Sequence, residues 1–156
     1  MIRACPSCGR SNRVPATHLA DAGTCGACRQ PLPPVATPME VTPADFDAIV
    51  AGARVPLLVD FWAPWCGPCR AAAPAVAETA ADMAGRAVVL KVNTDEHPDL
   101  AGRFGVRGIP HFVVLQGGQV RHQQSGLVPS SAMTEWLEMA GAGPPDGVAR
   151  RGGNGG

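Results

Sequence analysis

Six cysteines in three pairs of identical spacing constrain this chain more than any other feature of its sequence. Each pair has the form Cys-x-x-Cys, and the pairs are Cys5/Cys8, Cys25/Cys28 and Cys66/Cys69. The sequence opens Met1-Ile2-Arg3 without the apolar stretch of a secretory signal, so we expect a cytoplasmic protein. In that compartment, cysteines act as metal ligands or redox catalysts more often than as structural disulfides.

The composition excludes several classes of protein. Hydrophobic residues make up 46% of the 156 residues, which is enough for one ordinary domain and a smaller appendage. Thirteen Lys and Arg residues are balanced by thirteen Asp and Glu residues, so bulk charge does not favour nucleic-acid binding. No apolar run approaches the ~20 residues of a membrane-spanning helix.

Composition also divides the chain into segments. We expect a four-cysteine domain at 1–30, a Pro-rich linker at 31–38, a second domain at 39–140 and a disordered Gly/Pro-rich tail at 141–156. The linker contains four prolines, which favour an extended and semi-rigid spacer.

Strand and helix patterns alternate within residues 39–140. The expected elements are a helix beginning after Thr42, a strand at 56–62, a helix from about 66 to 84 that contains Pro74, a strand at 87–92, a short helix at 98–104, a hairpin of 111–116 and 119–123, and a helix at 130–140. This order predicts an α/β fold in which a mixed central sheet is flanked by helices.

The third cysteine pair lies where a predicted strand leads into a predicted helix, in the sequence WAPWCGPC at 62–69. Free backbone N–H groups and the helix macrodipole at this position stabilise a thiolate on Cys66. Cys69 follows one turn later and should be more buried. The spacing therefore favours an exposed nucleophile and a buried resolving thiol, whereas a third metal knuckle would lack a partner pair.

This octapeptide resembles the active-site motif of the thioredoxin family, and the resemblance covers about residues 39–140. Outside the motif it rests on Asp60, Pro74, Lys91 and the pair Ile109-Pro110. It implies a thioredoxin fold and protein-disulfide reductase activity, in which Cys66 attacks a target disulfide and Cys69 resolves the mixed disulfide. The active-site loop and substrate-binding residues that it implies are Trp65, Gly67, Pro68, Ile109 and Pro110.

Four residues carry further expectations. Asp60 interrupts an apolar strand, and a buried carboxyl there would accept a proton from Cys69. The resemblance implies that Lys91 is the partner of Asp60 and that Pro110 follows a cis peptide bond. His111 stands where the family commonly has threonine; it either alters redox behaviour through its titration or is a half-buried strand residue without a catalytic role.

The first two cysteine pairs match the spacing of a zinc site, Cys-x2-Cys-x16-Cys-x2-Cys. We expect Cys5, Cys8, Cys25 and Cys28 to form a closed shell around a structural Zn²⁺, with iron in a rubredoxin-like site as the alternative and two disulfides less favoured. A segment of ~30 residues needs such an ion to fold. A zinc-ribbon-like head on a thioredoxin domain resembles the bacterial thioredoxin-2 group.

The resemblance also implies partners. They are disulfide-containing protein substrates and an NADPH-dependent thioredoxin reductase; we expect a monomer with no bound organic cofactor and no membrane association. Two other functions remain open at this point: a disulfide oxidase or isomerase, and a redox-responsive, zinc-dependent chaperone.

Overall fold

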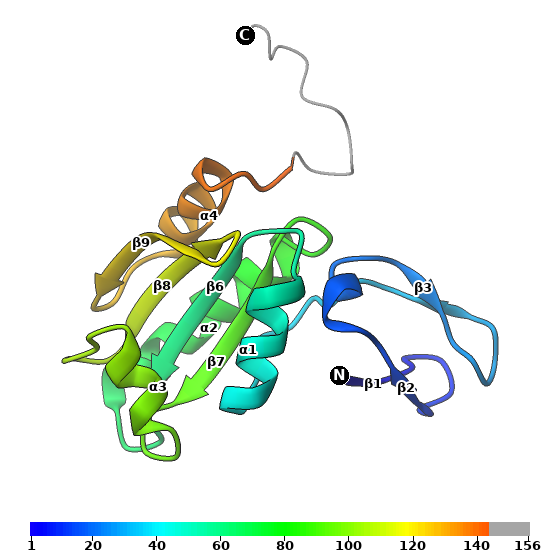
Figure 1. Ribbon diagram of the computed structural model, residues 1–156, viewed down its shortest axis with the longest axis horizontal. Helices are drawn as coiled ribbons and strands as arrows, with labels where there is room; N and C mark the ends of the chain where they lie inside the picture. Colours follow the sequence, from blue (N-terminus) through cyan, green and yellow to red (C-terminus); the bar gives the residue numbers. More distant parts are fainter. Residues whose placement is uncertain (144–156) are drawn as a thin grey trace, which may run out of the picture.

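A five-stranded mixed sheet organises the larger part of the molecule (Figure 1). The computed structural model describes residues 1–143. The strands are β5 (Met39–Glu40), β6 (Leu57–Trp62), β7 (Val88–Asn93), β8 (His111–Gln116) and β9 (Gln119–Ser125), in the order β5-β7-β6-β8-β9. β7 runs parallel to β5 and β6, whereas β8 is antiparallel to both β6 and β9. The predicted α/β fold with a mixed sheet is confirmed.

Helices cover both faces of this sheet. They are α1 (Pro43–Gly52), α2 (Gly67–Asp82), α3 (Pro98–Arg103) and α4 (Ser130–Met139). Side chains of α1 and α3 share one apolar cluster with Val59 and Phe61 of β6. Side chains of α2 and α4 share another cluster with Leu58. No helix within residues 1–143 is both long enough and apolar enough to cross a bilayer.

The central strand β6 is apolar on both faces because helices cover both of them. Alternation along the strand places Leu57, Val59 and Phe61 toward α1 and α3. Leu58 lies on the opposite face, toward α2, and the same alternation puts Asp60 and Trp62 on that face. The one carboxyl in the strand is thereby directed to the side of the sheet that carries Cys69.

Local sequence explains where the elements begin and turn. The hydroxyl of Thr42 accepts a hydrogen bond from the backbone N–H of Asp45 at 3.2 Å, so Thr42 caps α1 as predicted. The β8–β9 hairpin turns at Gly117 and Gly118, whose φ angles of 61° and 78° suit a two-residue turn in which both positions are left-handed.

Two small hairpins form an N-terminal ribbon. The first pairs β1 (Ile2–Ala4) with β2 (Ser11–Arg13), and the second pairs β3 (Gly23–Thr24) with β4 (Pro31–Leu32). A 3₁₀ turn, η1 (Ala16–His18), lies between them. The first two residues of the predicted spacer at 31–38 thus form strand β4. Val35 in the same stretch is buried, and its N–H donates to the carbonyl of Leu19 at 3.0 Å.

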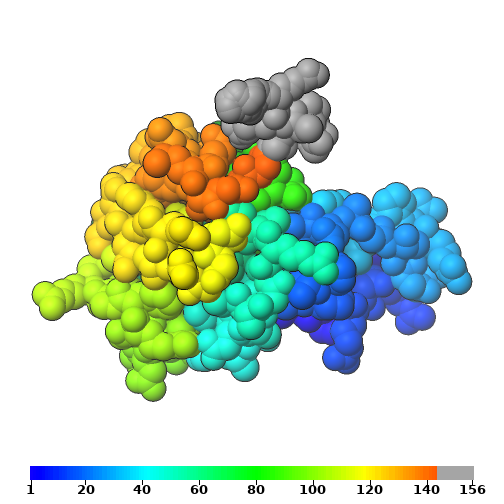
Figure 2. Space-filling view, turned by 45° about the horizontal axis from the view of Figure 1, so that its top comes forward, coloured from blue at the N-terminus to red at the C-terminus, as the bar shows by residue number. Residues whose placement is uncertain are grey.

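The ribbon packs against α1, and Figure 2 shows it in blue against this side of the larger unit. Leu19 and Val35 of the ribbon belong to the same apolar cluster as Ile49 of α1. A Cβ atom added to Gly52 would approach the methyl group of Thr17 in η1 to 3.0 Å. The absence of a side chain at Gly52 therefore permits the close approach of the two parts. The tail prediction for 141–156 falls almost entirely outside the described residues.

Candidate active site and metal centre

Cys66 and Cys69 form a disulfide at the N-terminus of α2, with their Cα atoms 5.2 Å apart. Cys66 is the N-cap residue, and its Sγ accepts a hydrogen bond from the backbone N–H of Cys69 at 3.1 Å. This contact is the one expected for a thiolate at a helix N-terminus, because the first N–H groups of a helix have no partner within it. The same donor remains available to Cys66 when the disulfide is reduced.

The exposures of the two cysteines differ from the prediction. Cys66 is 3% exposed and Cys69 is 5% exposed, so the expectation of an exposed nucleophile beside a buried partner is wrong for the oxidised form. The reason lies in the surrounding side chains, since Trp62 and Ile109 pack against the cysteine pair. The two sulfurs are therefore distinguished by their position on the helix and not by exposure.

A second loop faces the disulfide. The peptide bond between Ile109 and Pro110 is cis, as expected, and the carbonyl oxygen of Ile109 lies 3.7 Å from the Sγ of Cys66. Trp65 is 66% exposed, and its indole N–H donates to the carboxylate of Asp95 at 2.9 and 3.1 Å. Gly67 and Pro68, between the cysteines, are exposed.

A groove of about 320 Å³ lies beside the disulfide. Its lining includes Trp65 and Ile109, together with Pro98 of α3 and with Val106 and Arg107 of the loop that follows α3. The lining is largely apolar, and an extended peptide in the groove would lie beside the backbone of Ile109. The arrangement suits a protein substrate better than a small polar one.

Asp60 is buried beneath this site. It is 2% exposed, and its Oδ1 has no hydrogen-bond partner among the described residues. Burial is the main cause that raises the pKa of the Asp60 carboxyl to about 7. The positive charge of Lys91 opposes this rise, and the negative charge of Glu40 adds to it. A carboxyl with this pKa can both hold and release a proton at neutral pH.

Lys91 is the register partner of Asp60 on β7. Its ammonium lies over the ring of Trp62, 4.5 Å from the ring centre, and within the described part of the chain it forms no ion pair with Asp60. The two charges interact through space, because Lys91 lowers the pKa of Asp60. The expected partnership thus takes the form of an electrostatic effect without a direct contact.

His111 is buried in β8, and both of its ring nitrogens have partners on β9. Nδ1 lies 2.7 Å from the hydroxyl of Ser125, and Nε2 lies 2.9 Å from the side-chain oxygen of Gln123. The alternating pattern of β9 indicated a strand, but not which of its polar side chains would face His111. The structure favours the interpretation of His111 as a hydrogen-bonded strand residue.

The sulfur atoms of Cys5, Cys8, Cys25 and Cys28 all lie within 4.8 Å of one another. The Cys5–Cys28 and Cys8–Cys25 sulfurs are 3.7 and 3.8 Å apart. A tetrahedral shell with Zn–S distances of about 2.3 Å places its sulfurs about 3.8 Å apart, whereas a disulfide requires about 2.05 Å. The cluster therefore fits a four-coordinate metal ion and not two disulfides.

Hydrogen-bond donors near these sulfurs favour the thiolate form that binds a metal cation. The N–H of Cys28 and then the side-chain amide of Asn12 lower the pKa of Cys25 to about 6. The N–H of Gln30 lowers the pKa of Cys28, but desolvation and the three neighbouring sulfurs raise it to about 12. The opposite directions for Cys25 and Cys28 reflect the mutual repulsion of closely spaced sulfurs, which a bound cation would offset. Asn12, which also accepts from the N–H of Gly26 at 2.9 Å, was not identified from the sequence because its spacing to the cysteines carries no motif.

Comparison with known proteins identifies both parts of the chain. The thioredoxin family profile matches residues 37–139, and a profile described as the N-terminal domain of thioredoxin 2, a zinc ribbon, matches residues 4–30. The chain belongs to the thioredoxin family. It is a protein-disulfide reductase whose active-site pair is Cys66 and Cys69, as predicted.

Individual thioredoxins agree with this assignment. Thioredoxin 1 of Nostoc sp. (strain PCC 7120) is 46% identical over 99 residues, which are 64% of this chain and 92% of that protein. Thioredoxin C-3 of Corynebacterium nephridii is 36% identical over 138 residues, which are 88% of this chain and 94% of that protein. The solved structure of a mutant thioredoxin from Halobacterium salinarum NRC-1 is 31% identical in sequence and superposes with a TM-score of 0.63. The match covers 70% of this chain and 95% of the thioredoxin chain in that structure.

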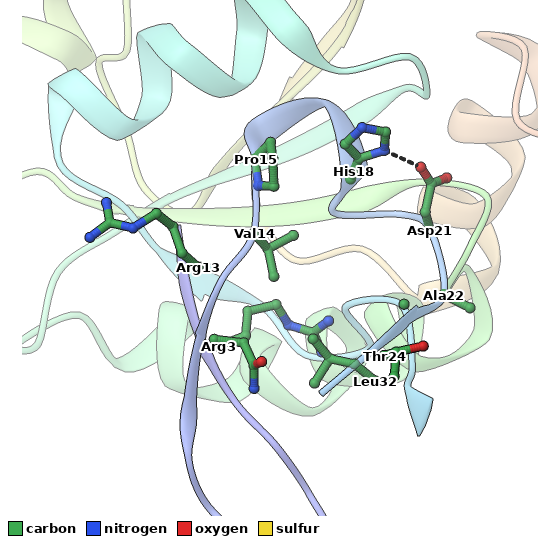
Figure 3. Close-up of a pocket in the computed structure, with 11 residues that line it drawn as sticks. Arg3, Arg13, Val14, Pro15, His18, Asp21, Ala22, Thr24 and Leu32 are labelled. Atoms are coloured by element: carbon green, nitrogen blue, oxygen red, sulfur yellow. Dashed lines mark hydrogen bonds and ion pairs between the residues drawn. The ribbon is translucent and has the colours of Figure 1, made fainter. Parts of the chain in front are cut away.

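The ribbon contains a separate cavity of about 280 Å³, shown in Figure 3. The side chains of Arg3 and Arg13 at its wall point in different directions, and Arg3 donates to the carbonyl of Pro33 at 2.6 Å. His18 lies 2.7 Å from Asp21, as the dashed line shows. The cavity is lined by ribbon residues, without either cysteine of the thioredoxin active site, so it is not where disulfide exchange occurs.

Proposed function

We propose that this thioredoxin acts on disulfide bonds of other proteins in the cytoplasm, with Cys66 as the attacking thiolate. Cys66 attacks one sulfur of the substrate disulfide, a mixed disulfide forms, and the other substrate sulfur leaves as a thiolate that takes up a proton. Cys69 then loses its proton and attacks Cys66, which releases the second substrate thiol. The substrate gains two electrons and two protons, and the Cys66–Cys69 disulfide forms. The 3.1 Å hydrogen bond from the Cys69 N–H to the Cys66 sulfur carries this assignment of roles.

Asp60 serves as the base for the second step in this proposal. Its position on the α2 side of β6 and its raised pKa of about 7 suit a group that accepts the proton of Cys69 and later returns it. Lys91 limits that rise through its charge, so that the carboxyl still ionises near neutral pH.

The proposed substrate-binding residues surround the groove beside the disulfide. They are Trp65, Gly67, Pro68, Ile109 and Pro110. An extended segment of the substrate lies along the backbone of Ile109, while the exposed ring of Trp65 provides apolar contact area next to Cys66.

We further propose that an NADPH-dependent thioredoxin reductase returns the disulfide to the dithiol. The protein acts as a monomer without a bound organic cofactor, and it binds neither membranes nor nucleic acid; its balanced charge agrees with the latter. The reductase would approach the same face as the substrates, because that face holds the disulfide.

We assign zinc to the four-cysteine site, held by Cys5, Cys8, Cys25 and Cys28, and iron is the alternative for the same shell. Four protein ligands leave no open position, so the ion supplies folding free energy to the ribbon and takes no part in the exchange. The sulfur spacing and the N–H donors to Cys25 support a closed thiolate shell.

The roles of the two active-site cysteines are tested by separate serine variants. Cys66→Ser should abolish reduction of insulin disulfides, because no thiolate remains to attack. Cys69→Ser should accumulate a mixed disulfide with the substrate, visible by mass spectrometry under non-reducing conditions. Full turnover by either variant would contradict the assignment.

A further inference from the structure

Three charged side chains form one row across three neighbouring strands. Lys91 on β7 is the register partner of Glu40 on β5 and also of Asp60 on β6. Residues paired in register project to the same face of a sheet. Glu40, Lys91 and Asp60 therefore lie side by side on the face covered by α2.

Burial increases steadily along this row. Glu40 at the edge of the sheet is exposed, Lys91 is half-buried, and Asp60 is 2% exposed. The row thus leads from solvent to the carboxyl beneath the disulfide. Solvent screens part of the field of Glu40 at the outer end, but the path from Glu40 to Asp60 runs along paired strands, where screening is weaker than in bulk water.

One ammonium group stands between two carboxyls in this arrangement. Lys91 forms no ion pair within 4.0 Å with either of them among the described residues, and its ammonium rests on the Trp62 ring instead. The ammonium group of Lys91 is attracted to both carboxylates and cannot fully compensate the negative charges of both. Within residues 1–143, the Oδ1 atom of Asp60 has no hydrogen-bond partner.

We propose that Glu40 is a positioning residue of the exchange reaction, which competes with Asp60 for the positive charge of Lys91 and so moves the ionisation of Asp60 toward neutral pH, where this carboxyl can both accept and return a proton. This inference rests on the proposed role of Asp60 as the base for Cys69. Glu40 touches neither the substrate nor the sulfurs; it acts through Lys91 and through its own field at Asp60.

The charges that face the two carboxyls agree with this direction. Asp60 faces Lys91 and Glu40 along the row, and Cys66 and Cys69 on α2 lie on the same side of the sheet. Lys91 lowers the pKa of Asp60 and Glu40 raises it, after burial as the main cause. Burial raises the pKa of Glu40 itself and Glu96 adds to that rise, whereas Lys91, the side chain of Trp62 and His97 lower it.

The test is a carboxyl ¹³C NMR titration of Asp60 in the oxidised full-length protein. Glu40→Gln should move the titration midpoint of Asp60 to lower pH, because Lys91 then compensates Asp60 alone. Glu40→Asp, which keeps the charge, should leave the midpoint near that of the unmodified protein. Glu135→Gln removes the same charge from the exposed side of α4 and should also leave it unchanged.

The same variants should differ in enzyme kinetics. Glu40→Gln should shift the acid limb of the pH profile for mixed-disulfide resolution to lower pH, by the same amount as the Asp60 midpoint. An unchanged or raised Asp60 midpoint in Glu40→Gln would overturn the inference, and so would an equal shift in Glu135→Gln. If Asp60→Asn leaves the acid limb intact while the midpoint still responds to Glu40, the proposed role of Asp60 fails and the electrostatic coupling stands.

Discussion

The buried carboxyl of Asp60, on the side of the sheet that carries the reactive sulfur pair, is the most consequential single group in this molecule. Asp60 sits in the central strand, where a neutral apolar residue would stabilise the fold more. Its unusual position was visible in the sequence as one charge within an apolar strand. The family resemblance also implied Lys91 as its partner, but Glu40 was not identified, since the register of β5 with β7 depends on long-range pairing that local patterns do not reveal.

The pKa of Asp60 predicts how stability depends on pH. Because folding raises this pKa to about 7 from an ordinary value of about 3.9, the folded state binds the proton more tightly than the unfolded state. Ionisation of the carboxyl therefore adds no cost below about pH 4 and destabilises the fold increasingly as pH rises toward 7. A rise of about three pKa units corresponds to a loss of at most about 4 kcal/mol in the free energy of unfolding.

Asp60→Asn should remove this dependence. Relative to the unmodified protein, the variant should gain free energy of unfolding between pH 4 and pH 8, measured by urea denaturation at a series of pH values. Asp82→Asn, on the exposed end of α2, provides the matched control and should show no such gain. A difference between Asp60→Asn and the unmodified protein that stays constant from pH 4 to pH 8 would disprove the assignment of a raised pKa.

At the scale of elements, helix α1 connects the two parts of the chain. One face packs on the sheet and its C-terminal end meets the ribbon, where Gly52 lies against Thr17. Caps, periodicity and turn residues predicted the helices of the larger unit and strands β6 to β9 to within a few residues. They did not predict β5, whose two residues form a strand by pairing with β7. The Pro-rich stretch was expected to form a spacer, and its composition did not reveal that Pro31 and Leu32 pair with β3 or that Val35 is buried.

Enlarging Gly52 should loosen the ribbon from α1. Gly52→Leu places bulk where even a Cβ atom approaches Thr17 to 3.0 Å, and overpacking of this kind costs about 1–3 kcal/mol. Hydrogen exchange should become faster in residues 14–20 and in the last turn of α1. Ala51→Leu adds the same bulk to an exposed neighbouring position and should leave exchange unchanged. Equal protection in the two variants would show that the contact does not hold the ribbon in place.

The whole molecule combines a four-cysteine ribbon, whose cluster fits a structural metal, with a redox domain whose active-site disulfide lies outside the ribbon. The sequence motifs identified both centres, because each depends on cysteines at fixed local spacing. They did not predict that the ribbon would share an apolar cluster with α1, since that contact depends on single side chains such as Leu19 and Ile49.

Metal removal should separate the two functions of the molecule. Chelation, or the variant Cys25→Ser, should abolish hydrogen-exchange protection in β1 to β4, because the ion supplies the folding free energy that so small a segment lacks. Reduction of insulin through Cys66 and Cys69 should continue at a similar rate. Loss of activity in proportion to metal loss would show instead that the ribbon takes part in the exchange.

The central claim is that the Cys66–Cys69 pair reduces other disulfides, and the reduction potential of this pair tests it most directly. The potential can be measured by equilibration in graded thiol buffers with the metal bound, using tryptophan fluorescence as the readout, since Trp62 packs against the cysteine pair. We predict a value near −270 mV, as is typical of thioredoxin and sufficient for reduction in the cytoplasm. A value near −180 mV or higher would contradict the account and identify an oxidase or isomerase.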